Sequence, residues 1–354
     1  MTHLFSPLTL RGVTLRNRIA VSPMCEYSSE DGLANDWHLV HLGSRAVGGA
    51  GLVITEAAAV TAQGRISPQD LGLYDDAQVE PLQRITRFIQ EQGAHTGIQL
   101  AHAGRKASTA RPWEGNGAVS EDQGGWLPVV APSPLAFSDR YLTPEMLDEA
   151  GIAEVVSAFA RSAERSLAAG FDLIELHAAH GYLLHEFLSP LSNTRGDGYG
   201  GGFDNRIRIV RETVEAVRRV WPERLPLIVR ISATDWTEGG WDADQSVALA
   251  RVLGPLGVDM IDCSTGGNVP RAPIPVGPGY QVPFAERIRR EADIPTAAVG
   301  MISEPAQADG IIQSGQADLV LLARELLRDP YWPRRAAKAL GQEITPPVQY
   351  GRAW

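Results

Sequence analysis

The sequence predicts a (β/α)8 barrel, and three observations lead to this prediction. Short apolar runs alternate with longer amphipathic stretches along the 354 residues. Nearly every run ends in polar residues or glycine, as expected where a site is assembled from the carboxyl ends of many strands. A doubly wound sheet, the alternative, would concentrate its site at one switch point, and no strand is followed by the glycine-rich dinucleotide fingerprint.

Eight apolar runs predict the strands of the barrel. Several are nearly continuous in Val, Ile, Leu and Ala, as are parallel strands that are buried on both faces. In chain order they are Arg18–Met24, Ala50–Val60, Thr96–Ala103, Phe171–Ala178, Leu225–Ala233, Val258–Ser264, Thr296–Met301 and Ala317–Ala323. The polar and glycine residues at their carboxyl ends are Cys25, Tyr27, Gln99, His102, His177, His180, Arg230, Gly266, Gly267, Gly300 and Arg324.

Helical patterns lie between these runs. The clearest cover Glu145–Ala169, Asn205–Val220, Gln245–Leu253 and Glu304–Ile312. For the first of them, Pro144 suits the beginning of a helix and Gly170 suits the position just after its end.

Two segments depart from this alternation. Ala107–Thr143 is long and rich in Pro, Gly and Trp, and it is too short to hold a core of its own. We expect it to be an excursion loop over the barrel mouth. Thr345–Trp354 is expected to be an extended tail, so residues 1–354 are predicted to form one domain.

Composition narrows the function classes. Hydrophobic residues make up 44% and charged residues 21%, which is typical of a globular protein with a large core. The net charge of −10 argues against a nucleic-acid partner, which requires a basic face. Two cysteines cannot hold an iron–sulfur cluster, and their scarcity fits a reducing compartment. With no signal-peptide or membrane-span pattern, we expect a cytoplasmic protein without membrane association.

Six segments carry a resemblance to a known family. In register along the chain they are SPMCEYSS (Ser22–Ser29), GIQLAHAGRKA (Gly97–Ala107), HAAHGYLLHEFLSPLSNTRGDGYGG (His177–Gly201), IVRISATD (Ile228–Asp235), AVGMI (Ala298–Ile302) and LLARELLRDP (Leu321–Pro330). Together they resemble the Old Yellow Enzyme family of NADH:flavin oxidoreductases over essentially the whole chain. The Cys of SPMC and the terminal GRAW are similar to the thermophilic-like, or xenobiotic-reductase, subclass.

The resemblance implies an FMN-dependent ene-reductase, or NAD(P)H dehydrogenase. NADPH or NADH would supply hydride, and activated alkenes such as enones, nitroalkenes and maleimides would accept it in ping-pong turnover. The resemblance assigns the FMN contacts to Pro23, Cys25, Ala57, Gln99, Arg230, Gly300, Ala323 and Arg324.

His177, His180 and Tyr182 are the residues expected to act on the substrate, with Tyr27 lining its pocket. By resemblance, the histidines donate hydrogen bonds to the activating oxygen, and Tyr182 protonates the α-carbon. The residues alone leave open two other interpretations of the histidines, a metal site and a structural role in the core.

Cys25, Gln99 and Arg230 are expected to contact the flavin ring. The resemblance implies that the Cys25 thiol tunes the flavin potential, and no Cys–His spacing indicates a nucleophile. A fixed guanidinium at Arg230 would favour the reduced, negatively charged flavin. Ala57 would form a small apolar wall.

The ends of the last two strands predict a phosphate site, because barrels commonly bind phosphate there. Gly300 permits close approach of the backbone, and Arg324 can pair with phosphate. Gly279 either joins this site or only shapes a turn. Arg105 and Lys106 are expected either at the pocket mouth or on the solvated surface.

The C-terminal motif predicts an oligomer. Tyr350, Arg352 and Trp354 match the subclass in which the terminal arginine reaches a neighbouring active site. We therefore expect a homodimer or homotetramer in which Arg352 contacts the partner's substrate.

Three rival functions remain for testing. Dienoyl-CoA reductases and amine dehydrogenases share the barrel but carry an iron–sulfur motif and further domains. A dihydrouridine synthase would act on tRNA, which the acidic charge disfavours. A non-catalytic flavin-binding protein would have no use for a proton donor such as Tyr182.

Overall fold

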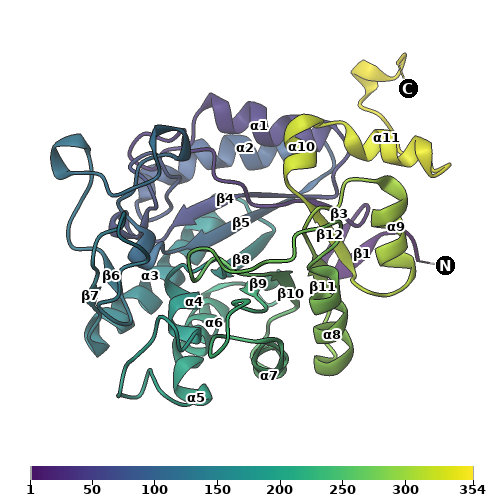
Figure 1. Ribbon diagram of the computed structural model, residues 1–354. Helices are drawn as coiled ribbons and strands as arrows, with labels where there is room; N and C mark the ends of the chain where they lie inside the picture. Colours follow the sequence, from purple (N-terminus) through teal and green to yellow (C-terminus); the bar gives the residue numbers. More distant parts are fainter. Residues whose placement is uncertain (1, 354) are drawn as a thin grey trace.

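A closed parallel barrel forms the centre of the computed structural model, which describes residues 2–353 (Figure 1). Its strands, each hydrogen-bonded to the next and the last to the first, are β3 (Ile19–Val21), β4 (Leu52–Ala59), β5 (His95–Ala101), β8 (Leu173–Ala178), β9 (Leu227–Ser232), β10 (Met260–Ser264), β11 (Thr296–Ala298) and β12 (Leu319–Leu322). Each of the eight predicted apolar runs contains one of these strands, with β5 beginning one residue earlier. The predicted barrel is confirmed.

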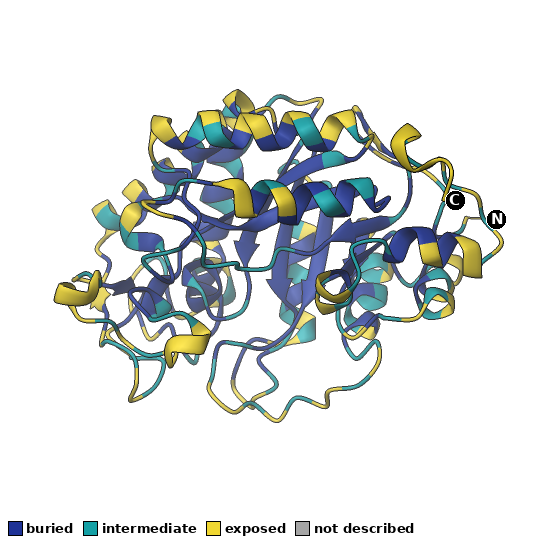
Figure 2. Ribbon diagram, turned by 90° about the horizontal axis from the view of Figure 1, so that it is seen from above, coloured by how far each residue is buried: buried dark blue, intermediate teal, exposed yellow. Residues whose placement is uncertain are grey.

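Helices surround the barrel and turn their apolar faces toward it. They are α1 (Asp36–Val47), α2 (Val79–Glu91), α3 (Glu149–Ala168), α4 (Leu183–Leu188), α5 (Phe203–Arg206), α6 (Arg208–Val220), α7 (Ala243–Leu253), α8 (Val282–Ala292), α9 (Pro305–Gln313), α10 (Arg324–Arg328) and α11 (Trp332–Ala339). Figure 2 shows the buried strands at the centre and exposed residues on the outward turns of the helices. Among residues 2–353, no helix is both long enough and apolar enough to cross a membrane.

The predicted start of the helix at Pro144 is wrong. α3 begins at Glu149, because the Asp148 side chain accepts a hydrogen bond from the Gly151 N–H at 2.7 Å and caps the helix there. The residues after Pro144 form a short strand, β7 (Glu145–Met146), which pairs with β6 (Val130–Ala131). The capping side chain, and not the proline, determines where this helix begins.

A hairpin absent from the predicted elements closes the amino-terminal end of the barrel. β1 (Leu8–Leu10) pairs with β2 (Val13–Leu15), and the turn between them contacts the chain just before β9 and β10. Gly12 N–H donates to the Arg224 carbonyl at 2.8 Å, and Arg11 Nε lies 2.5 Å from an Asp259 carboxylate oxygen. With this end covered, the carboxyl ends of the strands are left to form a site.

The excursion loop lies over the carboxyl end of the barrel, as predicted. The Trp126 indole N–H donates to the Gln63 carbonyl at 3.0 Å, which ties the loop to the segment after β4. The Phe137 ring lies 4.1 Å from the Lys106 amine, and Trp113 packs edge-on against Tyr27 at 5.8 Å. The loop therefore contributes aromatic side chains to the barrel mouth.

Candidate active site

The turn after β8 brings three predicted residues together. His177 lies at the end of β8, and its ring centre is 5.1 Å from that of His180 and 5.0 Å from that of Tyr182. His180 has a φ of 58° and the next residue, Gly181, a φ of 70°, so the chain reverses sharply between the two histidines and the tyrosine. This left-handed turn aims all three rings into one region of the barrel mouth.

A close backbone approach fixes the position of this turn. A Cβ on Gly181 would lie 2.3 Å from the Gly267 carbonyl oxygen, and one on Gly267 would lie 2.6 Å from the His180 Cα. The Gly181 N–H donates to His185 Nδ1 at 2.9 Å. Only glycine at both positions allows the loops after β8 and β10 to touch in this way.

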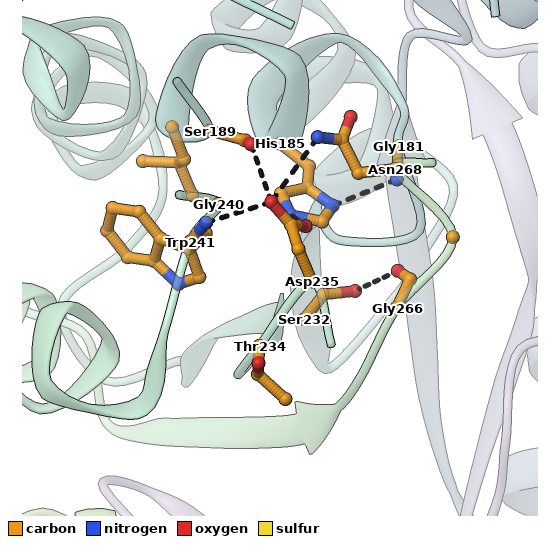
Figure 3. Close-up of polar contacts among 12 residues, drawn as sticks. Gly181, His185, Ser189, Ser232, Thr234, Asp235, Gly240, Trp241, Gly266 and Asn268 are labelled. Carbon is orange, nitrogen blue, oxygen red and sulfur yellow. Dashed lines mark hydrogen bonds and ion pairs between the residues drawn. The ribbon is translucent and has the colours of Figure 1, made fainter. Parts of the chain in front are cut away.

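His185 is itself held by a buried carboxylate (Figure 3). Its Nε2 lies 3.0 Å from Asp235, and neither side chain is exposed. Asp235 also accepts hydrogen bonds from the Ser189 hydroxyl at 2.5 Å and the Trp241 backbone N–H at 2.9 Å. Against the effect of burial, His185 and these donors hold the pKa of Asp235 below its usual range. The sequence motifs did not identify this pair, because its contact joins segments far apart in the chain.

The two histidines of the turn are neutral donors. Burial lowers the pKa of both His177 and His180 well below the usual value, and the Arg230 charge lowers it further. His177 Nδ1 accepts the Ala179 N–H at 3.3 Å, which leaves its proton on Nε2. His180 Nε2 contacts the Ser264 hydroxyl at 2.7 Å.

Tyr182 and Cys25 keep their protons. Burial, followed by the influence of Cys25, raises the pKa of the Tyr182 phenol well above its usual value. Burial and the nearby carboxylates Asp70 and Glu56 raise the pKa of the Cys25 thiol. Both side chains, with Tyr27, pack against one small apolar cluster at the mouth. A protonated phenol can serve as an acid, and a thiol of raised pKa is a poor nucleophile.

Gln99 and Arg230 lie inside the barrel, both almost fully buried. A β-bulge in β4 precedes Ala57 and brings this small residue level with Gln99. The Arg230 Nη1 donates to the Ser22 hydroxyl at 3.0 Å. Pro23 and Cys25 follow directly after this serine, so the predicted ring contacts converge on one end of the barrel.

A cavity of about 320 Å³ lies at the ends of β11 and β12, and Ser264 is among the residues that line it. Gly300, Ala323 and Arg324 line it, as the predicted phosphate site requires. The exposed Arg324 guanidinium has no carboxylate partner among the described residues, whereas nearby Arg328 pairs with Glu325. Gly279 donates its N–H to the Gly300 carbonyl at 3.0 Å, so it shapes the backbone beside this cavity.

Lys106 and Arg105 lie at the pocket mouth rather than on the solvated surface. The Lys106 amine donates to the carbonyls of His180, at 2.7 Å, and Gly267, at 2.5 Å. Burial lowers the pKa of Lys106 to about 7. Arg105 donates to the Asn268 carbonyl at 2.6 Å. These two basic side chains connect the turn after β8 to the loop after β10.

Arg352 is not part of this constellation within one chain. It is exposed in the tail, which projects beyond α11 in Figure 1, where Val348 is 91% exposed. Trp354 lies outside the described residues. The other predicted site residues lie at the carboxyl end of the barrel, and the tail lies apart from them.

Comparisons with known proteins show which family the chain resembles and which solved structure it matches in fold. A sequence model of the NADH:flavin oxidoreductase / NADH oxidase family matches residues 3–343. The chain is 52% identical over 355 residues to the NADPH dehydrogenase of Geobacillus sp. (strain WCH70), covering 100% of this chain and 99% of that protein. It is 49% identical over 353 residues to the NADPH dehydrogenase of Bacillus subtilis (strain 168), covering 99% of each. A structure of morphinone reductase in complex with tetrahydroNAD superposes with a TM-score of 0.79 at 26% identity, covering 99% of this chain and 94% of that one.

Proposed function

The chain belongs to the NADH:flavin oxidoreductase / NADH oxidase family, the Old Yellow Enzyme family, and we propose that this FMN-dependent NAD(P)H oxidoreductase reduces activated alkenes. The observation that carries the proposal is the turn after β8. It places the neutral imidazole of His180 and the protonated phenol of Tyr182 at 5.1 Å and 5.0 Å from the neutral imidazole of His177. Hydrogen-bond donors beside an acid suit an alkene conjugated to a carbonyl or nitro group.

The residues present fit FMN. The cavity at the ends of β11 and β12 offers Arg324, which has no carboxylate partner within residues 2–353 and suits a phosphate dianion. Gln99 and Arg230 provide an amide and a guanidinium for the ring, with Ala57 as an apolar wall. We assign Pro23, Cys25, Gly300, Ala323 and Arg324 to the remaining contacts.

The protein's own residues would then act as follows. FMN, when bound, supplies the two-electron chemistry that accepts hydride from NAD(P)H and returns it to the β-carbon of the alkene. His177 donates its Nε2–H to the activating oxygen and stabilises the negative charge that builds there. Tyr182 donates its phenolic proton to the α-carbon. Because both substrates use one site in turn, the kinetics are ping-pong.

We propose that His180, like His177, donates a hydrogen bond to the activating oxygen, after giving up its present contact. Its Nε2 contacts Ser264 at 2.7 Å, so a substrate oxygen would replace that hydroxyl. Tyr27 lines the pocket beside Trp113 of the excursion loop. The relatives' name, NADPH dehydrogenase, favours NADPH over NADH as the donor.

A double variant tests the assignment. H177A/H180A should retain FMN, since neither histidine belongs to the proposed phosphate or ring contacts. Reoxidation of the reduced enzyme by cyclohexenone should slow by at least about 10²-fold. Unchanged reoxidation would contradict the proposal.

Arg352 is proposed to complete the neighbouring site in a homodimer or homotetramer. The exposed tail and its apolar Val348 support this placement. Sedimentation velocity should give a dimer or larger, and removal of residues 345–354 should weaken assembly and alkene binding together. A monomer of full alkene affinity would exclude a shared site.

A further inference from the structure

Four polar side chains form a buried cluster inside the barrel, one from each of four neighbouring strands. They are Gln99 from β5, Glu175 from β8, Arg230 from β9 and Asp262 from β10, and none is more than 5% exposed. Gln99 and Glu175 are aligned in the β5–β8 pair, and Arg230 and Asp262 in the β9–β10 pair. Glu175 and Asp262 have no role in the mechanism above. Burying an ionisable side chain in an apolar strand costs free energy, so their presence calls for an explanation.

Glu175 determines which way the Gln99 amide points. The Gln99 Nε2 donates to Glu175 Oε1 at 2.6 Å. With its NH2 group turned toward Glu175, the amide keeps its carbonyl oxygen and one N–H for other partners. An apolar residue at position 175 would remove the contact that holds this orientation.

The cluster holds two carboxyl groups but only one guanidinium. Arg230 Nε lies 3.2 Å from Asp262 Oδ2, and Asp262 in turn contacts Glu175. The second oxygen of Glu175 accepts no hydrogen bond from the described residues. Burial raises the pKa of both Glu175 and Asp262, and the Asp262 charge raises that of Glu175 further. One proton shared between the two carboxyls leaves a single negative charge against Arg230.

Few other ionisable groups act on this pair. β8 itself adds His177, which is neutral, and β10 adds Cys263, whose pKa burial raises well above its usual value. β3, β11 and β12 carry no ionisable side chain, and on β5 only His95 at the far end is ionisable. Glu56, on β4, lies 3.2 Å from His38. Arg230 is therefore the one counter-charge facing the pair among the described strand residues.

We propose that Glu175 is a positioning residue for the flavin, which orients the Gln99 amide and shares with Asp262 a proton that sets the net charge behind Arg230. This inference rests on the proposed function, in which Gln99 and Arg230 hold the flavin ring. Negative charge on the reduced ring favours protonation of the pair. Over the pH range where the pair titrates, reduction of the flavin by two electrons is accompanied by transfer of one additional proton from water to the carboxyl pair.

The reduction potential of the bound FMN tests this coupling. We would measure it spectroelectrochemically on the holoenzyme from pH 6 to 10. Within the pH range where the pair titrates, the potential should fall with pH by about 30 mV per pH unit more than it does outside that range. The reason is that a tenfold change in equilibrium constant is about 30 mV for a two-electron couple. E175Q mimics the protonated acid, so its potential should lack this added slope. E175L should also bind FMN more weakly.

A matched control is Glu186→Gln. Glu186 is another fully buried glutamate, whose carboxylate accepts the Arg105 backbone N–H at 2.9 Å and contacts neither Gln99 nor Arg230. E186Q should retain the wild-type slope. If E175Q fails to retain FMN, D262N provides the same test, because removing either carboxyl removes the shared proton.

The outcomes separate the two proposals. If Gln99→Leu leaves both potential and FMN affinity unchanged, the ring contacts of the proposed function are wrong. If Gln99→Leu shifts them while E175Q and D262N keep the wild-type slope, the ring contacts stand and the role of Glu175 is refuted. Loss of the slope in E186Q as well would also overturn the inference.

Discussion

Replacing Gly181 by alanine would place a methyl group where a neighbouring loop already lies. The added Cβ would lie 2.3 Å from the Gly267 carbonyl oxygen and 2.7 Å from the Asn268 Cα. Both obstacles are backbone atoms, so no side-chain rotation can relieve the contact. The turn with His180 and Tyr182 must therefore move relative to the loop after β10.

The magnitude follows from two contributions. Alanine at a φ of 70° costs about 1 kcal/mol in backbone strain. Real Cβ contacts are essentially never shorter than 3.0 Å, so the turn must also shift by about 0.7 Å. A displacement of that size in a catalytic group costs about 10²-fold in rate. We expect G181A to lose this factor in reoxidation by cyclohexenone while it retains FMN.

Gly201→Ala is the matched control. Gly201 has a φ of 74°, nearly that of Gly181, but a Cβ there would meet nothing within 4 Å. G201A should carry only the backbone cost of about 1 kcal/mol in urea unfolding, with wild-type turnover. Stopped-flow measurement of each half-reaction then isolates the effect of the close approach. If G181A and G201A match in both stability and reoxidation rate, our account of the turn is refuted.

Three further predictions concern protonation states. Y182F should slow alkene-dependent reoxidation by about 10²-fold with little effect on reduction by NADPH, as single-turnover kinetics would reveal; equal slowing of both half-reactions would contradict its role as acid. The raised pKa of Cys25 predicts that iodoacetamide at pH 8 alkylates the thiol far more slowly than a free cysteine, which mass spectrometry would measure; rapid labelling would refute this. The hydrogen bond with Asp172 raises the pKa of His95, so its stabilising contribution is fully present below about pH 6.5 and lost as pH rises through the folded value. Urea unfolding of D172N should lack this pH-dependent component, and a wild-type profile would contradict the pairing.

The barrel could be predicted from the sequence because its strands are buried on both faces. Such strands leave long apolar runs, and polar residues at their ends reveal the site. His177, His180 and Tyr182 were assigned to the substrate by the family resemblance, and they lie within six residues of one another at the end of one strand. Local patterns of this kind require no knowledge of how distant segments pack.

Other features depend on contacts between distant segments. The Pro144 prediction failed because the Asp148 side chain, four residues later, supplies the cap. His185 and Asp235 were not identified, because their contact forms only when α4 packs against the loop after β9. Glu175 and Asp262 did leave a signal, since each is an acidic residue within an apolar strand. Their pairing still required the register of the barrel.

The most direct test of the central claim is an anaerobic visible spectrum of the purified protein, with NADPH added first and cyclohexenone second. We predict that the flavin absorbance bleaches with NADPH and recovers with cyclohexenone. NADPH reduces the flavin, and the reduced flavin then reduces the alkene at the same site. A protein that bleaches but does not recover would contradict alkene reduction while leaving the family assignment intact. A protein that takes up no FMN would contradict the cofactor assignment itself.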